Sequence, residues 1–209
     1  MGKKNKKQWD RMMAGKLYQP LLVGDDSWDR IHDACYAFNQ SAFGHNEKEF
    51  TELRENLGTA PDALSIFPPF YCDHGDRIHF GKHCFANTDI TILDENDVRI
   101  GDNVFLAPHV SIYTAGHPIA PDIRNLDLEY ALPVTIGDNV WIGGNVVINP
   151  GVTIGSNTVI GSGSVVTRDI PDWVIAAGNP CKVIREITEE EKDLWKQKYQ
   201  EYKEECGED

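Results

Sequence analysis

His117 is the side chain in this sequence best suited to proton transfer near neutral pH. It lies in the segment Thr114–Pro118, where a regular aliphatic pattern gives way to a polar stretch with several prolines. A neutral imidazole there could take a proton from a hydroxyl or an amine. A histidine on a surface loop, without a chemical role, is the alternative interpretation.

Two further groups of polar residues could bind a ligand. Asp73 and Asn87 could hydrogen-bond a polyol, although Asn87 also suits a corner of the chain because asparagine tolerates a positive φ. Arg168, Lys182 and Arg185 form a local basic cluster in an otherwise acidic protein, and such a cluster suits phosphates. A set of solvated charges explains this cluster equally well.

The histidines and cysteines do not predict a metal site. His74, His79 and His83 form the densest histidine group, but spacings of five and four place them on different faces of a six-residue coil. The five cysteines are scattered and lack a C-x-x-C pair, which indicates a reducing compartment: Cys35, Cys72, Cys84, Cys181 and Cys206. Of these, Cys72, Cys84 and Cys181 are interpreted as packed thiols and not as nucleophiles.

A six-residue repeat supplies the scaffold for these side chains. Between residues 134 and 169 an aliphatic residue falls on every sixth position: Ile136, Ile142, Ile148, Ile154, Ile160 and Val166. This period fits neither an amphipathic helix nor an alternating strand, and it is typical of a parallel β-helix of hexapeptides. Segments such as 137–139 and 155–157 are expected to turn the corners, with glycine and asparagine at positive φ.

The rest of the chain divides around this repeat. The six-residue pattern begins after Pro61, slips by two residues within 94–97, and lapses over 113–133, which predicts an extruded functional loop. Ser27 and Asn46 are predicted to cap two helices that cover the open end of the solenoid. A capping box at Thr188–Glu191 predicts a final helix.

We therefore expect three regions. They are a helical cap at 1–60, a β-helix domain at 61–185 and a C-terminal helix with its tail at 186–209. The basic run Lys3–Lys7 is interpreted as a solvated tail.

Composition narrows the class of partner. The formal net charge of -13 disfavours nucleic-acid binding, which needs a basic face. No apolar run is long enough for a membrane span, and the basic N-terminus lacks the apolar stretch of a secretory signal. We expect a cytoplasmic protein with no nucleic-acid or membrane partner.

The motifs resemble those of the maltose/galactoside O-acetyltransferase family of hexapeptide acyltransferases, over nearly the whole chain. The matching segments are 14–18, 38–41, 70–75, 85–87, 114–118, 133–155, 166–171 and 177–181. The hexapeptide repeat marks only a broad superfamily. The Trp141 segment joined to the Gly116-His117-Pro118 loop is a much narrower signal.

The resemblance implies a left-handed β-helix that forms homotrimers, with acetyl-CoA between neighbouring subunits and no metal. It assigns His117 as the general base for direct attack of a sugar hydroxyl on the thioester, with Asn87 as a second catalytic residue. Asp73, Asn87 and Glu95 match acceptor-contacting positions. The N–H of Gly144 matches the donor facing the thioester carbonyl. Positions that match coenzyme A contacts are Ser162, Thr167, Arg168, Lys182 and Arg185.

Some positions depart from the galactoside branch and leave the acceptor open. Pro20 stands where that branch carries an acidic contact, and Asp73 stands where it carries a serine, so Cys72-Asp73 is closer to the maltose branch. Three alternatives remain. They are a related acetyltransferase acting on an antibiotic or on serine, a zinc hydratase of the same fold, and a non-catalytic β-helix scaffold.

Overall fold

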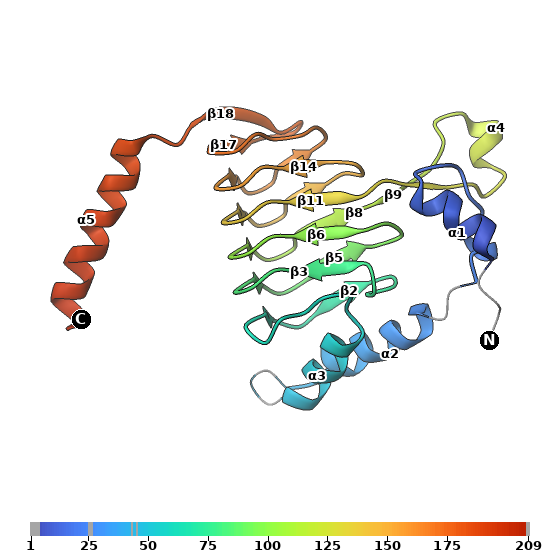
Figure 1. Cartoon of the computed structure of the whole chain (residues 1–209), viewed down its shortest axis with the longest axis horizontal. Helices are drawn as coiled ribbons and strands as arrows, with labels where there is room; N and C mark the ends of the chain where they lie inside the picture. The colour runs from blue at the N-terminus through green and yellow to red at the C-terminus, as the bar shows by residue number, and fades with distance from the viewer. Residues whose placement is uncertain (1–4, 25–26, 43, 45, 208–209) are drawn as a thin grey trace.

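A computed structural model describes residues 5–24, 27–42, 44 and 46–207. The chain winds through successive coils that stack into a prism, with helices at both ends (Figure 1). Each coil contributes short parallel strands to three sheets. The predicted left-handed parallel β-helix, with its helical cap, extruded loop and C-terminal helix, is confirmed as the fold class.

The chain visits the three sheets in a fixed order, from sheet I to sheet II to sheet III. Sheet I contains β2 (Phe70–Cys72), β5 (Ile90–Leu93), β8 (Ser111–Tyr113), β13 (Val147–Ile148) and β16 (Val165–Val166). Sheet II contains β3 (Ile78–Phe80), β6 (Val98–Ile100), β11 (Val134–Ile136) and β14 (Thr153–Ile154). Sheet III contains β1 (Ser65–Ile66), β4 (Phe85–Ala86), β7 (Phe105–Leu106), β12 (Trp141–Ile142), β15 (Val159–Ile160), β17 (Val174–Ala177) and the antiparallel β18 (Lys182–Glu186).

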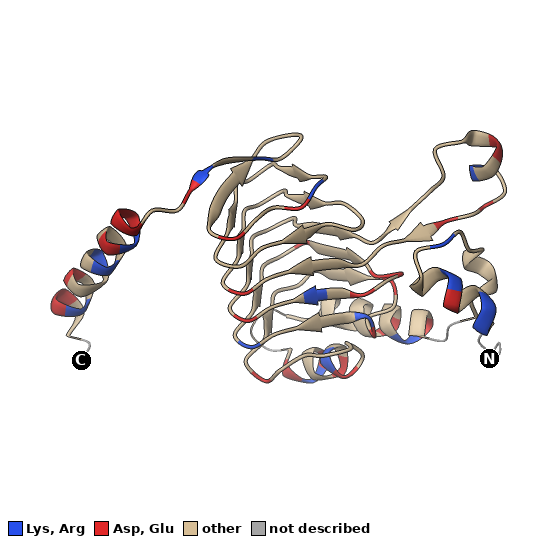
Figure 2. Ribbon diagram, turned by 45° about the horizontal axis from the view of Figure 1, so that its top comes forward, with Lys and Arg blue, Asp and Glu red and all other residues tan. Residues whose placement is uncertain are grey.

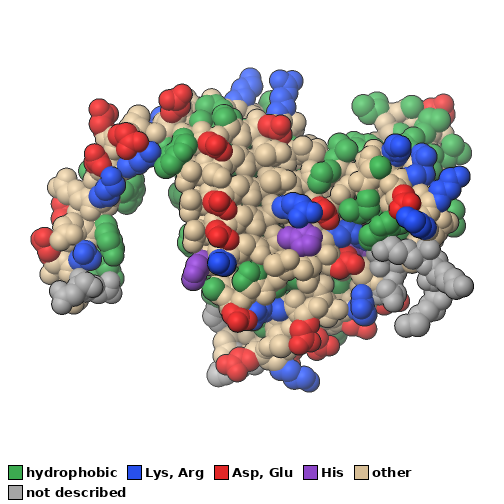
Figure 3. All heavy atoms as spheres, in the orientation of Figure 1, with side chains coloured by type: hydrophobic (Ala, Val, Ile, Leu, Met, Phe, Trp, Pro, Cys, Tyr) green, Lys and Arg blue, Asp and Glu red, His purple; other side chains and the backbone are tan. Residues whose placement is uncertain are grey.

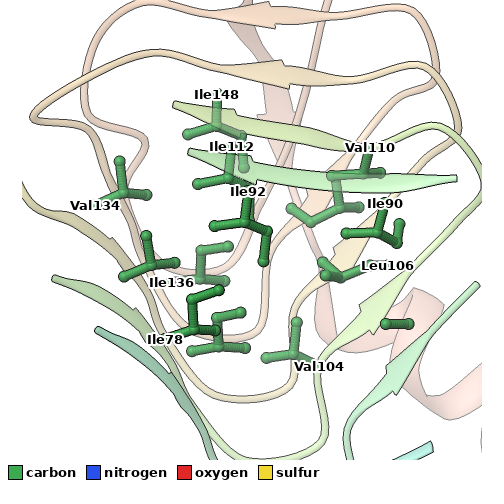
Figure 4. Packing of buried hydrophobic residues seen from close by; sticks show 14 of the residues in the cluster. Ile78, Ile90, Ile92, Val104, Leu106, Val110, Ile112, Val134, Ile136 and Ile148 are labelled. Carbon is green, nitrogen blue, oxygen red and sulfur yellow. The ribbon is translucent and has the colours of Figure 1, made fainter. Parts of the chain in front are cut away.

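Aliphatic side chains from all three sheets fill the interior of the solenoid (Figure 4). Ile112 pairs in register with Ile92 in one neighbouring coil and with Ile148 in the other, and all three are fully buried. Because isoleucine stacks on isoleucine in this column, these neighbouring coils have a similar internal width. Burial of these apolar columns is the main favourable contribution to the stability of the solenoid.

The corners differ from the prediction in one respect. Asn139 and Asn157 adopt the expected positive φ of 56° and 58°, and the amide of Asn139 donates to Asn157 Oδ1 at 3.0 Å. Gly137 and Gly155, in contrast, are not among the positive-φ residues of the described chain. A Cβ on Gly155 would lie 2.5 Å from the backbone nitrogen of Asp172. These glycines are needed because adjacent coils approach closely.

Acidic side chains recur along the coils and contribute to this close packing (Figure 3). The carboxylates of Asp102, Asp138 and Asp172 each accept a backbone N–H from the preceding coil, at 2.6–2.8 Å. These aspartates therefore have a structural role in joining the coils, and their negative charge is not evidence for or against a particular binding partner.

Two helices close the N-terminal end of the solenoid, as predicted. They are α2 (Ser27–Gln40) and α3 (Glu47–Glu55), and they lie below β2 in Figure 1. Ile31 and Phe38 of α2 and Leu53 of α3 are fully buried in the same core as Phe70. The cap thus removes the exposed apolar surface of the first coil.

The extruded loop leaves the solenoid after β8 and packs against the N-terminal segment. Its ends pair as antiparallel strands β9 (Ala115–Gly116) and β10 (Tyr130–Ala131), with the short helix α4 (Pro121–Arg124) beyond them. The N-terminal segment that the loop contacts contains α1 (Lys6–Met13) and a 3₁₀ turn, η1 (Pro20–Leu22). Met12 and Tyr18 form a small buried cluster with Ala131.

The prediction of a solvated basic tail is wrong for Lys6 and Lys7, which form the first turn of α1. Asn5 caps this helix by accepting the N–H of Gln8. The packing of Met12 against the loop stabilises a short helix that its basic sequence does not signal. Lys3 and Lys4 lie outside the described residues.

The C-terminal helix α5 (Glu189–Cys206) begins with the predicted capping box between Thr188 and Glu191. It extends away from the solenoid in Figure 1 and buries none of its side chains. Near its start, Lys192 Nζ lies 3.5 Å from the centroid of the Trp173 ring. No helix in the described part of the chain is long and apolar enough to cross a membrane.

Candidate functional site

Most of the predicted site residues lie along two edges of the prism. The loop edge is the corner where sheet I passes to sheet II, and it carries Asp73 after β2, Glu95 after β5 and the His117 loop after β8. The glycine edge is the corner where sheet III passes to sheet I. It carries Asn87 after β4, Gly144 after β12 and Ser162 after β15. Sheet I separates the two edges.

His117 lies immediately after β9, held by the loop but open to solvent. Its side chain is 56% exposed, and its Nδ1 lies 3.3 Å from the carbonyl oxygen of Leu128. Because a carbonyl can only accept, this contact favours the tautomer with the proton on Nδ1. The lone pair of Nε2 is then free to accept a proton.

Glu129 faces this lone pair from the opposite strand of the loop. Its Oε1 lies 3.9 Å from His117 Nε2, and its side chain is 19% exposed. The other oxygen, Oε2, accepts a 2.8 Å hydrogen bond from the hydroxyl of Tyr18, a residue that is 1% exposed. Burial raises the pKa of the Tyr18 hydroxyl, and the neighbouring Glu129 raises it further, so Tyr18 stays a donor.

Asp73 and Glu95 form a hydrogen-bonded pair of carboxyl groups next to this cluster. Burial, together with the hydrogen bond to Asp73, raises the pKa of Glu95 to about 8, and burial also raises the pKa of Asp73. Glu95 therefore keeps a proton near neutral pH and can donate it toward Asp73. The pair can offer both acceptor and donor oxygens to a polyhydroxylated ligand.

Asp94 supports the pair from beneath. It is fully buried, and its Oδ1 accepts the backbone N–H groups of Asp73 and His74 at 3.0 and 2.9 Å. Burial raises its pKa to about 6. The side chain of Arg77 donates to the Asp94 carbonyl at 3.0 Å and stacks over the Trp9 ring, which anchors this corner to α1. In Figure 2, acidic residues gather where the coils turn toward the N-terminal helices and the loop.

A cavity of about 500 Å³ opens between the N-terminal segment and the loop edge. Glu95, Glu129, Tyr18 and His74 supply its polar lining, and the indole of Trp28 supplies an aromatic face. Its remaining walls come from Met12, Pro20, Leu21, Val23 and Gly24. A few convergent polar groups on an apolar wall are typical of a small-molecule site.

The glycine edge carries a second, separate cavity. It measures about 350 Å³, and Asn87 shares it with the outward-facing aromatic residues Phe85, Phe105 and Trp141. The rings of Phe105 and Trp141 are about half exposed, at 51% and 56%. The side-chain oxygen of Asn87 accepts the N–H of Thr88 at 2.8 Å, so its amide NH₂ remains the group that can meet a ligand.

Gly144 and Ser162 continue along the same edge. In the part of the chain that the structure describes, the N–H of Gly144 donates to no protein group, and its carbonyl accepts from Gly163 at 2.8 Å. A Cβ on Gly144 would meet only the Pro108 carbonyl, at 3.2 Å. The backbone is thus accessible to a ligand, as the predicted role in facing a thioester carbonyl requires.

The predicted coenzyme-binding cations lie near the C-terminal end of the solenoid, where Figure 3 shows basic side chains. Thr167 and Arg168 follow β16, and Lys182 is an exposed residue of β18. The N–H of Cys181, just before β18, donates to the carbonyl oxygen of Val165 in β16, which connects the start of β18 to this coil. Arg185 already forms a two-pronged ion pair with Glu191 of α5, at 2.5 and 2.6 Å.

The histidine group has local partners. His74 Nδ1 lies 3.0 Å from the Ser27 hydroxyl, and His79 Nδ1 lies 3.1 Å from the Thr59 hydroxyl. Among the described residues, no group of three or more His, Cys, Asp or Glu side chains is placed to hold a metal ion.

The structure brings together His117, Asp73 and Glu95, and it places Asn87 and Gly144 elsewhere. Tyr18, Trp28, Asp94 and Glu129 were missed as site residues. Glu129 lies in the irregular loop, where no periodicity predicts which residue faces His117. Tyr18 carried one signal, because it ends the matching segment 14–18.

A hexapeptide solenoid with an extruded histidine loop defines a class of acyl-transferring proteins, and comparisons with known proteins refine it. The bacterial transferase hexapeptide family (six repeats) matches residues 133–168. The galactoside O-acetyltransferase of Escherichia coli K12 is 43% identical over 191 residues, covering 91% of this chain and 94% of that protein.

Two solved structures share the fold at 45% identity. A galactoside acetyltransferase in complex with coenzyme A superposes with a TM-score of 0.85, covering 88% of this chain and 93% of that one. A maltose O-acetyltransferase from Clostridium difficile 630 superposes with a TM-score of 0.82, covering 87% and 98%. The chain belongs to the maltose/galactoside branch of the hexapeptide-repeat acetyltransferases.

Proposed function

We propose that this enzyme transfers the acetyl group of acetyl-CoA to a hydroxyl of a small sugar, with His117 as the general base. One observation carries the proposal. His117 is held with the Nε2 lone pair free, beside a cavity lined by carboxyl groups and an aromatic ring. Carboxylates accept hydrogen bonds from sugar hydroxyls, and an aromatic face packs against the apolar side of the ring.

In the proposed reaction, His117 Nε2 takes the proton of the attacking hydroxyl. The hydroxyl oxygen bonds to the thioester carbonyl carbon, and the carbonyl oxygen becomes negatively charged. The N–H of Gly144, with Asn87 on the same edge, would stabilise that charge. Collapse breaks the carbon–sulfur bond, and the proton on Nε2 passes to the sulfur, releasing the O-acetyl sugar and coenzyme A.

The coenzyme would lie along the glycine edge. Gly144 and Ser162 follow each other up this edge, and Lys182 lies at its C-terminal end, paired with Ala177 of β17. Thr167 and Arg168 follow β16, at the corner of the last coil where sheet I passes to sheet II. Cations there suit the coenzyme's phosphates. Arg185 can bind a coenzyme phosphate only if its guanidinium contacts the phosphate and Glu191 together, or if its ion pair with Glu191 breaks.

Assembly as a homotrimer would complete the site. His117 lies on the loop edge, next to Glu129 of its cavity, whereas Asn87 lines the cavity of the glycine edge, so a site that uses both is best formed when the loop edge of one subunit meets the glycine edge of the next. The half-exposed Phe105 and Trp141 are suitable contact residues for such an interface.

We also propose a cytoplasmic location. The five cysteines are unpaired thiols, four of them buried, as suits a reducing compartment. No disulfide is needed to hold the solenoid.

Release of coenzyme A thiol from acetyl-CoA tests the proposal, with a panel of glucosyl and galactosyl sugars, serine and antibiotic acceptors. We expect release with sugars, and His117→Ala should lower turnover by roughly 10²–10⁴-fold, the usual contribution of a general base. His83→Asn is the control, because His83 is an exposed corner residue at a φ of 55° that asparagine tolerates.

The outcomes separate the alternatives. A decrease below threefold in His117→Ala would remove His117 from the mechanism. Release of coenzyme A thiol only with serine or an antibiotic would support acetyl transfer by His117 but to an acceptor other than a sugar. Failure to bind acetyl-CoA would contradict the enzyme assignment and favour a scaffold.

A further inference from the structure

Three side chains form a line from the protein interior to the proposed base. The buried Tyr18 hydroxyl donates to Glu129 Oε2 at 2.8 Å, and Glu129 Oε1 lies 3.9 Å from His117 Nε2. Neither Tyr18 nor Glu129 has a role in the proposed reaction. Their arrangement therefore needs its own explanation.

The backbone holds this line in place at two points. Tyr18 and Glu129 exchange both backbone hydrogen bonds, at 2.9 and 3.0 Å, as an antiparallel bridge. One residue further along, Tyr130 pairs with Gly116, which precedes His117. A Cβ on Gly116 would lie 2.6 Å from the Tyr130 ring, so the two loop strands are closely packed. The positions of Glu129 and His117 are thus fixed relative to each other by neighbouring rungs of one ribbon.

The hydrogen bond from Tyr18 also fixes the orientation of the carboxylate. With Oε2 accepting from Tyr18, Oε1 is the oxygen directed at His117. A contact of 3.9 Å is too long for a hydrogen bond to a neutral ring, whose Nε2 carries a lone pair. It becomes an attractive ion pair when Nε2 gains a proton, because opposite charges at this distance interact even near a protein surface.

We propose that Glu129 is a positioning residue that stabilises the protonated imidazolium of His117 during acetyl transfer, with Tyr18 holding its carboxylate in place. This inference rests on the proposed role of His117 as the base. The Leu128 carbonyl and the Glu129 carboxylate act on opposite nitrogens of the ring. The Leu128 carbonyl selects the tautomer whose Nε2 can accept a proton. The Glu129 carboxylate then stabilises the imidazolium that forms.

The test compares Glu129→Gln and Glu129→Asp in the acetyl-transfer assay. Glutamine keeps an oxygen that can accept from Tyr18 but removes the charge, whereas aspartate keeps the charge at a shorter reach. We expect Glu129→Gln to lower kcat on the order of 10- to 100-fold, the size of effect known for partners that orient metal-bound histidines, with KM for acetyl-CoA unchanged. Glu129→Asp should recover part of that loss. Glu52→Gln, on the exposed side of α3, is the matched control for removal of a carboxylate.

A double-mutant cycle with His117→Ala separates positioning from a structural effect. If Glu129 acts through His117, Glu129→Gln should cost less than twofold in the His117→Ala background. An equal loss in both backgrounds, or an unchanged kcat in Glu129→Gln alone, would overturn the inference. If His117→Ala loses activity but Glu129→Gln does not, only this inference is contradicted. If His117→Ala keeps full activity, the proposed function itself is contradicted.

Discussion

Paired carboxyl groups give the loop edge its chemical character at the scale of single residues. Asp73 and Glu95 lie together in a partly buried corner, where two full negative charges would repel each other without water to screen them. Holding one proton between them avoids this cost and supplies a donor for a ligand oxygen. The buried Asp94 beneath them fixes the backbone of Asp73 and His74.

This arrangement predicts that stability falls as pH rises. The pKa of Glu95 goes from an ordinary value of 4.5 in the unfolded chain to about 8 in the folded one. Between these values the folded state binds more protons than the unfolded state, so the free energy of unfolding decreases with increasing pH. Asp94, whose pKa rises to about 6, acts in the same direction over the lower part of this range.

Urea unfolding at a series of pH values and one protein concentration measures this dependence. We expect Glu95→Gln, which cannot ionise, to unfold with a flatter pH profile than the wild type between pH 5 and 8, the window set by the shifted pKa of Glu95. Asp62→Asn is a suitable control, because Asp62 lies on the surface, paired with Arg54. Parallel profiles for wild type and Glu95→Gln would show that Glu95 titrates normally in the folded protein.

Secondary-structure elements were predictable from sequence wherever a short-range rule decided them. The six-residue pattern predicted the strands because each coil must place an aliphatic side chain inside. Helix α2 followed from the helical spacing of the buried positions Ile31 and Phe38, and α5 followed from the capping box at Thr188. Each of these features is determined by residues close together in the chain, so a single sequence is enough to predict it.

Elements held by distant contacts were not predictable. Helix α1 depends on Met12 packing against Ala131 of the loop, more than a hundred residues away. The β9–β10 ribbon that directs Glu129 toward His117 has no alternating pattern, and its register is fixed by Tyr18. The sequence therefore predicted His117 and Asp73, and the family resemblance added Glu95, but neither predicted the neighbouring Glu129 and Tyr18.

The close approach of the coils gives a prediction for the glycine positions. A Cβ at Gly155 would lie 2.5 Å from Asp172 N and 2.7 Å from Pro171 C, whereas Gly163 has open space but a φ of +74°. Gly155→Ala should therefore destabilise the protein by about 3 kcal/mol, near the upper end for overpacking, because backbone cannot move aside. Gly163→Ala should cost only about 1 kcal/mol, from the left-handed conformation.

Chemical unfolding of both variants checks this order. Equal losses, or a larger loss for Gly163→Ala, would mean that the coils can separate at the Gly155 corner.

The prism as a whole presents its two functional edges on either side of sheet I. Along the loop edge come the proposed base and the acidic pair. Along the glycine edge come Asn87 and the backbone of Gly144. A cyclic trimer brings unlike edges together three times, because each subunit offers one edge to each neighbour. The scaffold would then supply stiffness, and the assembly would supply the complete site.

Subunit complementation tests this organisation directly. His117→Ala and Asn87→Ala should each form trimers of low activity, since every site lacks one group. Unfolding the two together in urea and refolding them as mixed trimers should restore activity to roughly one quarter of the sites, where an intact loop edge meets an intact glycine edge by chance. Sedimentation of the refolded mixture establishes that trimers have formed.

The matched control combines His117→Ala with Glu95→Ala. Both changes lie on the loop edge, in the same region of one chain, so no mixed trimer contains an intact loop edge and activity should stay low. Restoration in the first mixture but not in the second would assign His117 and Asn87 to different subunits of one site. Absence of restoration in both, with trimers present, would place the complete site within a single chain. The separation of His117 from Asn87 by sheet I would then have to be bridged by movement of the loop.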